Sequence, residues 1–224
     1  MPSEDYMDRD EQDERDDIID ADEDHGLVDD IADEDTDLDD AEDTDDADDD
    51  TVTFASLGLP EEILEAVTDM GFRFPTPIQA AAIPPLLELR DVVGIAQTGT
   101  GKTAAFGLPL LAIVDADERD VQALVLAPTR ELAMQSAQAI EDFAARTARL
   151  DVVPVYGGSP YGPQIGALKR GAQVVVGTPG RVIDLIEKGA LDLSNVRMLV
   201  LDEADEMLRM GFAEDVETIA SSAP

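Results

Sequence analysis

The sequence predicts an α/β fold in which a mostly parallel sheet is flanked by helices. Short runs of Val, Leu and Ile alternate with helical segments from residue 91 onward. The runs are continuously apolar, as expected for parallel strands that are buried on both faces. Glycine-rich and polar motifs follow several of these runs, at the position where ligands bind in such folds. The sequence therefore indicates an α/β domain that binds a ligand at one edge of its sheet.

The segment that precedes the first apolar run is predicted to be helical. One helix opens after Pro60, carries Glu61 and Glu62 in its first turn, and stops at Gly71. The Phe-Pro-Thr-Pro sequence at 74–77 then forms a rigid turn, and a second short helix follows it. We expect these helices to form a cap on the sheet.

The remaining elements alternate between strands and helices. Helices are expected over residues 102–114, 129–146 and 181–188. Pro154 interrupts the third apolar run, which places that strand near an edge of the sheet. The expected strands are Asp91–Ala96, Gln122–Ala127, Asp151–Tyr156, Gln173–Gly177 and Arg197–Leu201.

The first fifty residues differ sharply from the rest. They hold 28 acidic and 2 basic residues, a net charge of −26, whereas residues 51–224 carry −11. Few apolar side chains are present, so burial cannot offset the entropy of ordering this segment. We therefore expect residues 1–50 to be a disordered acidic tail. It could act as a solubilising arm, or as a decoy that occupies the basic surfaces of partners in competition with nucleic acid.

The composition also excludes several classes of protein. The chain has no cysteine, so disulfides and thiolate metal sites are impossible, and its single histidine, His25, lies in the acidic segment. The N-terminus is acidic and lacks the apolar region of a signal peptide. No apolar run approaches the roughly 20 residues that span a bilayer. A cytoplasmic protein without a membrane segment is expected.

A glycine-rich loop follows the first expected strand and opens the next helix. This context is the one required of a phosphate-binding loop. The loop comprises Ala96, Gln97, Thr98, Gly99, Thr100, Gly101, Lys102 and Thr103. Backbone amides at the glycines and the helix N-terminus would face phosphate oxygens. Lys102 would reach the β- and γ-phosphates, and Thr103 would bind Mg²⁺. The competing interpretation is a glycine-rich turn with a chance Lys-Thr pair.

The last expected strand is followed by the acidic sequence Asp202-Glu203-Ala204-Asp205. Asp202 would hold Mg²⁺ and Glu203 would orient or deprotonate the attacking water, a sensible division of labour for phosphoryl transfer. Lys102 lies about a hundred residues upstream. Similar acidic clusters at 20–24 and 32–35 follow no strand and no phosphate-binding loop, so position distinguishes the one at 202.

Taken together, these segments resemble the first RecA-like domain of a DEAD-box RNA helicase, a P-loop NTPase fold. The resemblance extends over residues 51–224, with a Q-motif region at 52–82. The motifs occur in the order typical of the family: FASLGLP to GFRFPTPIQ (Phe54–Gln79), AQTGTGKT (96–103), PTRELA (128–133), GG (157–158), TPGR (178–181), DEAD (202–205) and MGF (210–212).

The resemblance implies that the chain binds ATP and Mg²⁺. It assigns catalytic roles to Lys102, Asp202 and Glu203, and metal binding to Thr103 and Asp202. Gln79 would recognise adenine through its amide, with Phe54 and Arg73 near the base. From the residues alone, Gln79 could equally be a polar residue at a helix start, and Phe54 an ordinary core anchor.

The resemblance also implies sequence-independent contacts with an RNA backbone. From the residues alone, TPGR is equally a helix N-cap with Pro at the first position, and the two arginines could pair with Glu131 and Asp184. Because the chain is acidic, its RNA binding should be weak and sensitive to salt. The expected RNA-binding residues are Pro128, Thr129, Arg130, Gly157, Gly158, Thr178, Pro179, Gly180 and Arg181.

The sequence pattern of the family continues beyond what these 224 residues hold. No Ser-Ala-Thr motif follows the DEAD segment, and no second RecA-like domain is present. We therefore expect the chain to be cut off inside its first domain. Asp205 would couple to the absent motif between domains. The expected function is an ATP-dependent RNA helicase that remodels or unwinds short duplexes, although this chain alone should bind ATP and RNA weakly with negligible turnover.

Two alternatives remain open. The chain could be a non-catalytic nucleotide- or RNA-binding module, or a DNA-directed helicase of superfamily 2. The resemblance of residues 54–79 to the Q motif weighs against the DNA-directed enzyme.

Overall fold

The computed structural model describes residues 52–97, 99–145 and 150–224. The chain divides into two units, Met1–Asp46 and Ala47–Pro224, and all described residues belong to the second. The prediction of a disordered tail over residues 1–50 falls outside the described residues. Within the described part of the chain, no helix has both the length and the apolar character needed to cross a membrane.

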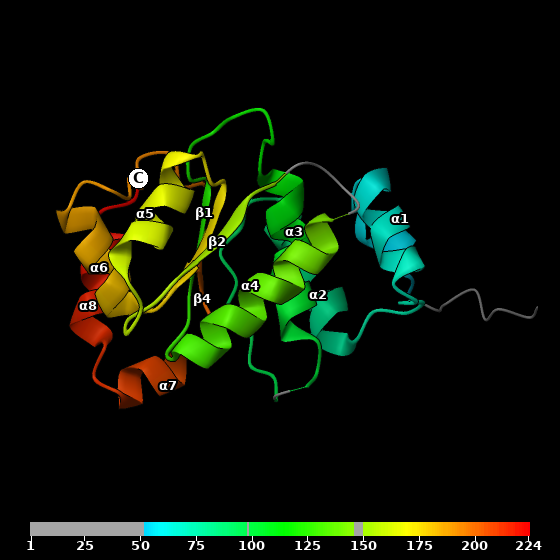
Figure 1. The fold of residues 1–224 in the computed structure, drawn as a ribbon. Coiled ribbons are helices and arrows are strands. Elements are labelled where there is room, and N and C mark those ends of the chain that lie inside the picture. Colours follow the sequence, from blue (N-terminus) through cyan, green and yellow to red (C-terminus); the bar gives the residue numbers. More distant parts are fainter. Residues whose placement is uncertain (1–51, 98, 146–149) are drawn as a thin grey trace, which may run out of the picture. The chain divides into compact units, whose positions relative to one another are not determined.

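The core of the fold is a four-stranded sheet in which all neighbouring strands are parallel (Figure 1). Its strands are β1 (Ala123–Leu126), β2 (Val152–Val155), β3 (Val174–Gly177) and β4 (Met198–Leu201), in the order β2-β3-β1-β4. β1 and β3 lie inside the sheet and are buried along their whole length. Their continuous apolar runs match this double burial. The predicted α/β fold is confirmed.

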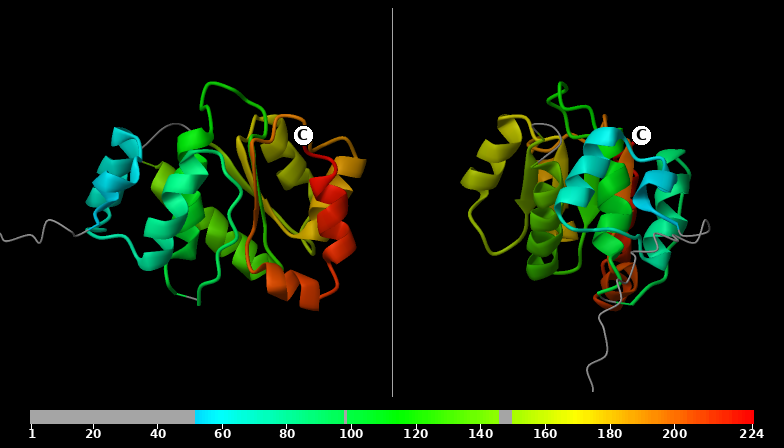
Figure 2. Two further views of the ribbon diagram at one scale, coloured as in Figure 1. Left: turned by 180° about the vertical axis from the view of Figure 1, so that it is seen from behind. Right: turned by 90° about the vertical axis from the view of Figure 1, so that its right-hand side faces the viewer.

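Helices cover both faces of the sheet (Figures 1 and 2). Side chains that point to one face, such as Val125 and Val176, pack with the N-terminal helices in one core. Those that point to the other face, such as Leu124 and Val175, pack with the C-terminal helices in a second core. The first group comprises the 3₁₀ helix η1 (Phe54–Leu57) with α1 (Glu61–Asp69), α2 (Pro77–Leu87), α3 (Lys102–Ile113) and α4 (Arg130–Ala144), and the second comprises α5 (Tyr161–Lys169), α6 (Pro179–Glu187), α7 (Ala204–Arg209) and α8 (Ala213–Ala220).

Several predicted boundaries are confirmed. α1 follows Pro60 and is succeeded by Gly71 in the left-handed region, at φ 83°. α2 begins at Pro77 with a capping box formed by Thr76 and Gln79. β2 lies at the edge of the sheet, as Pro154 predicted, because a proline has no backbone N–H to donate to a neighbouring strand.

The strand predicted at Asp91–Ala96 is wrong. Residues 91–97 form an extended loop in which Val93 and Ile95 are 94% and 96% exposed. An apolar run becomes a strand only when a neighbouring backbone completes its hydrogen bonds. β4 pairs with β1, and among the described residues no strand lies on the other side of β4. The run at 91–96 therefore has the composition of a strand without the partner that a strand requires.

This difference can be tested by comparing two truncations to alanine. Leu124→Ala should lower the free energy of unfolding by about 3 kcal/mol, because Leu124 is buried between the sheet and its helices. Ile95→Ala should change it by less than about 0.5 kcal/mol, because its side chain lies in solvent. Urea denaturation of both variants measures the difference. An equal loss at Ile95 would show that the segment packs as a buried strand after all.

Candidate functional site

The carboxyl ends of the four strands lie level at one edge of the sheet. The register pairs Leu126 with both Gly177 and Leu201, and Val155 with Gly177. Backbone hydrogen bonds continue past the ends of the strands, as from Asp202 N–H to Leu126 O at 2.9 Å. The segments that follow the strands therefore form one row, which contains residues 127–130, 156–159, 178–181 and 202–203.

The glycine-rich loop leads into the N-terminus of α3. Gly101 is the N-cap residue, with a left-handed backbone at φ 84°, and Lys102 is the first residue of the helix. A β-carbon at Gly101 would collide with the side-chain amide of Gln79. Only glycine satisfies both constraints, so the helix presents its first N–H groups and positive dipole end without a side chain at the cap. Thr98 falls outside the described residues.

An ion pair joins this helix to the acidic turn after β4. Lys102 Nζ lies 2.6 Å from Glu203 Oε1, and both side chains are about one-quarter exposed. Glu203 itself adopts a left-handed conformation, with φ 50° and ψ 49°, and caps α7. Such a conformation is uncommon for a residue with a β-carbon and is concentrated at functional sites. The two sequence motifs therefore meet in space and share a charge-assisted hydrogen bond.

Asp202 lies beside this pair and is partly buried. Burial of its carboxylate raises the pKa of Asp202 above the ordinary value, and the neighbouring charge of Glu203 adds to the rise. A hydrogen bond from Ser136 Oγ to Asp202 Oδ2, at 3.2 Å, opposes it. Ser136 is buried on α4 and was missed by the sequence analysis. In the sequence, the only indication of its role was that a small polar residue lies on the apolar face of a predicted helix.

The donor set at this site fits Mg²⁺ held together with a nucleotide. Among the described residues, no group of three or more acidic or histidine side chains could hold a metal by itself. Mg²⁺ is commonly bound by one or two carboxylates together with phosphates and water. Asp202 supplies the carboxylate, and Thr103, in the first turn of α3, supplies a hydroxyl.

Both ends of the Gln79 side-chain amide are hydrogen-bonded within the protein. Its side chain is 3% exposed, and its Oε1 accepts a hydrogen bond from Thr76 N–H at 2.9 Å. Its Nε2 donates to Gly101 O at 3.1 Å. The amide thus ties the start of α2 to the glycine-rich loop. Adenine recognition by Gln79 stays a prediction, and it would require one of these bonds to be shared or broken.

Of the two other residues predicted near the base, one is buried and the other is exposed. Phe54 is 5% exposed and packs edge-to-face against Phe72, with ring centroids 6.5 Å apart. This is the core-anchor position that its residue type alone allowed. Arg73 is exposed to solvent.

The segments predicted to contact RNA lie side by side along the row. Thr129 caps α4 by accepting a hydrogen bond from Leu132 N–H at 3.2 Å. Thr178 and Pro179 form the N-cap and first position of α6, which is the geometry expected of TPGR whether or not it contacts RNA. Arg130 is exposed, and its guanidinium carbon lies 4.7 Å above the centre of the Tyr156 ring. The tertiary structure thus brings the predicted segments together, while their RNA contacts stay predictions.

Arg181, which is also predicted to contact RNA, turns its side chain into the protein. Its side chain is 6% exposed, and the guanidinium donates to Ser159 O at 3.0 Å and to Gln164 Oε1 at 2.9 Å. Asp184 lies 4.0 Å away, which partly matches the ion pair considered from sequence. The Nε of Arg181 has no hydrogen-bond partner in this arrangement, and an RNA contact by Arg181 stays a prediction.

Asp205 points to solvent. Its carboxylate accepts a hydrogen bond from Arg209 at 3.1 Å, and both side chains are more than half exposed. Its predicted role in interdomain coupling is compatible with this exposure but stays a prediction.

The fold and the loop before α3 define a RecA-like P-loop domain, and comparison with known proteins supports this class. The structure is similar to that of a DEAD box protein from the hyperthermophile Methanococcus jannaschii, with a TM-score of 0.73 and 46% identity over 77% of this chain and 47% of the other. A structure described as a hypothetical ATP-dependent RNA helicase from Sulfolobus tokodaii has a TM-score of 0.67 and 41% identity, covering 73% of this chain and 47% of the other.

The sequence comparisons give the family. The DEAD/DEAH box helicase model matches residues 76–224, and the chain belongs to that family. The ATP-dependent RNA helicase DeaD of Haemophilus influenzae is 59% identical over 175 residues, which are 78% of this chain and 28% of that protein. The protein of the same name from Mycobacterium tuberculosis is 58% identical over 77% of this chain and 31% of its own length. The chain thus spans about three-tenths of the length of these relatives.

The Lys102–Glu203 ion pair leads to opposite expectations for its two partners. Lys102→Ala should weaken binding of a non-hydrolysable Mg-ATP analogue about tenfold or more, because it removes the cation that would meet the phosphates. Glu203→Gln should bind the analogue as tightly as the parent or more so, because it removes an internal competitor for Lys102. Isothermal titration measures both, with Lys169→Ala on exposed α5 as the control. A loss at Glu203→Gln equal to that at Lys102→Ala would contradict competition.

Proposed function

We propose that the chain is the ATP-binding part of an ATP-dependent RNA helicase, which binds and hydrolyses ATP to remodel or unwind short RNA duplexes. The observation that carries this proposal is the contact between Lys102 and Glu203, which lie 101 positions apart in sequence. It brings a phosphate-binding helix N-terminus and a turn with two adjacent carboxylates into one site. Family membership and the names of the relatives point to the same activity.

Different residues of the chain have different roles in the proposed phosphoryl transfer. Lys102 and the first N–H groups of α3 would bind the phosphates, and Asp202 with Thr103 would hold Mg²⁺. When bound, Mg²⁺ neutralises charge that develops on the phosphate oxygens. Glu203 orients the attacking water and accepts its proton. The buried Ser136 hydroxyl holds one oxygen of the Asp202 carboxylate in place.

The ion pair also couples nucleotide binding to the availability of Glu203. In the structure, Lys102 and Glu203 neutralise one another. A phosphate that recruits Lys102 leaves the Glu203 carboxylate without its cation and able to accept a hydrogen bond from water. The water-orienting group is therefore released by the substrate that it acts upon.

RNA is the proposed partner of the row formed by residues 127–130, 156–159 and 178–181. Backbone N–H groups, the threonine hydroxyls and the exposed Arg130 suit phosphates and sugars, which carry no base sequence. Residues 51–224 have a net charge of −11, so long-range attraction to RNA is poor. We propose that binding depends on this local strip and is correspondingly weak and sensitive to salt.

We further propose that these 224 residues alone bind ATP and RNA but turn ATP over negligibly. Two features support this. Glu203 is held by Lys102, and the segment before the phosphate-binding loop is an exposed extended chain rather than a strand that would brace the loop. Under these conditions the chain acts as a nucleotide- and RNA-binding module, the alternative considered from its sequence. No feature of the described residues favours DNA over RNA.

Binding measurements test the proposal directly. The chain should bind a Mg-ATP analogue and a labelled oligo(U) strand, and a DNA strand of matching sequence should bind more weakly. The same preparation should release little inorganic phosphate from ATP with or without RNA. Absence of nucleotide binding would overturn the assignment of the phosphate-binding loop, and a preference for DNA would overturn the RNA assignment.

The role of Arg130 can be separated from that of other arginines by its dependence on salt. Arg130→Ala should weaken oligo(U) binding and reduce the slope of log affinity against log salt concentration by about one, because one phosphate contact is lost. Arg197→Ala is the matched control, since Arg197 is exposed at the opposite end of the strands and pairs with Glu118. Fluorescence anisotropy over a series of salt concentrations gives both slopes. An unchanged slope in Arg130→Ala would exclude a phosphate contact.

A further inference from the structure

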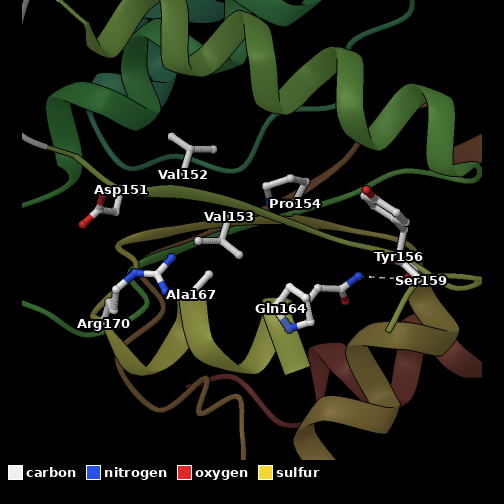
Figure 3. A pocket seen from close by; sticks show the side chains of 10 residues that line it. Asp151, Val152, Val153, Pro154, Tyr156, Ser159, Gln164, Ala167 and Arg170 are labelled. Carbon is white, nitrogen blue, oxygen red and sulfur yellow. Dashed lines mark hydrogen bonds between the residues drawn. The ribbon is translucent and has the colours of Figure 1, made fainter. Parts of the chain in front are cut away.

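Gln164 lies outside every motif that the sequence analysis identified, yet it contacts two of them. Its side chain is 6% exposed and projects from α5 toward the end of β2. Its Nε2 donates a hydrogen bond to Tyr156 O at 3.2 Å, which Figure 3 shows at one end of a groove between β2 and α5. Its Oε1 accepts a hydrogen bond from Arg181 at 2.9 Å. One buried amide therefore joins the turn after β2 to the first turn of α6.

Arg181 completes a second connection to the same turn. Its guanidinium donates to Ser159 O at 3.0 Å, while Gln164 bonds to Tyr156 O. The turn formed by residues 156–159 is thus held by a backbone carbonyl at each end, and the two side chains that hold it bond to each other. Between these points lie Gly157 and Gly158, which contribute no side chains of their own to fix the turn.

Neighbouring contacts tie the 156–159 turn to the helices on either side. The guanidinium carbon of Arg181 lies 4.1 Å above the centre of the Tyr161 ring, and the Tyr161 hydroxyl donates to Asp184 at 2.6 Å. On the other side, Arg130 lies over the ring of Tyr156. Three turns that follow three different strands are therefore linked through one network, in which Gln164 and Arg181 are buried and Arg130 is exposed.

We propose that Gln164 is a positioning residue for RNA binding, which holds the 156–159 turn in a fixed place relative to Arg130 and to the TPG turn at 178–180. This inference rests on the proposed function, because it assigns the row of turns to an RNA backbone. Gln164 is buried and uncharged, so it neither reaches a phosphate nor adds to the electrostatic attraction. It acts by ordering the contact surface before RNA arrives, which lowers the entropic cost of binding.

A pair of matched glutamine variants tests the inference. Gln164→Met keeps the approximate size and flexibility of the side chain but removes both hydrogen bonds. Gln173→Met is the control, because Gln173 is also buried and bonds to the backbone at Asp151 and Glu118, but at the amino ends of the strands. Both variants should lose similar stability in urea, so a difference between them reports on position rather than on folding.

Gln164→Met should bind labelled oligo(U) about tenfold more weakly than the parent. This ratio of affinities corresponds to the net free energy of about one hydrogen bond. Its affinity for a Mg-ATP analogue and its slope of log affinity against log salt should equal those of the parent, since no charged contact is removed. Gln173→Met should bind oligo(U) like the parent. Faster amide hydrogen exchange at Gly157 and Gly158 in Gln164→Met alone would accompany the loss.

A second variant keeps the proposal testable if Gln164→Met does not fold. Gln164→Glu retains an acceptor for Arg181 but loses the donor to Tyr156 O. Its affinity for RNA should lie between those of the parent and Gln164→Met. If Gln164→Met does not fold, Gln164→Glu should still bind RNA more weakly than the parent. Binding by Gln164→Glu equal to that of the parent, or equal losses in Gln164→Met and Gln173→Met, would overturn the inference alone. A parent chain that fails to bind oligo(U) would overturn the proposed function and the inference with it.

Discussion

The level register of the parallel strands is the constraint on which the rest of the structure depends. Because Leu126 pairs with both Gly177 and Leu201, the chain leaves neighbouring strands at the same height. Every polar segment that follows a strand therefore arrives at the same edge. A slip of one position would reverse the faces of a strand and move its carboxyl end out of the row. The alternation of side chains between the two apolar cores maintains this register.

The nucleotide side of this edge is organised by charge. Lys102 at the start of α3 meets Glu203 after β4, and Ser136 on α4 holds the neighbouring Asp202. The left-handed backbone at Glu203 directs that carboxylate toward Lys102 while Asp202 N–H remains bonded to β1. Two adjacent carboxylates consequently point to different partners. In the proposed function, this separation would let one carboxylate bind the metal and the other a water molecule.

The opposite side of the edge is organised by neutral hydrogen bonds and ring contacts instead. The buried side chains of Gln164 and Arg181 bond to backbone carbonyls, and Arg130 lies over Tyr156. An unpaired buried polar group is costly, and both ends of the Gln164 amide are paired, whereas the Nε of Arg181 has only Asp184 at 4.0 Å. The glycines of the 156–159 turn can therefore expose their backbone to a ligand without leaving the turn unsupported.

The sequence by itself determined the class of fold, the order of its elements from β1 onward, the edge position of β2 and the meeting of the Lys102 and Asp202 segments. The fold class, the element order and the edge position of β2 follow from local apolar runs and from Pro154. The meeting of the two segments is predicted from the pairing of a phosphate-binding loop with an acidic turn, although, in the part of the chain that the structure describes, that loop follows no strand. The tertiary structure alone decided the rest. The run at 91–96 has no neighbouring strand among the described residues, and Arg181 turns inward because Ser159 O and Gln164 are within reach. Ser136 and Gln164 gained their roles from partners 66 and 17 positions away. Local composition encodes burial and periodicity, whereas hydrogen-bond partners are chosen by the packing of distant elements.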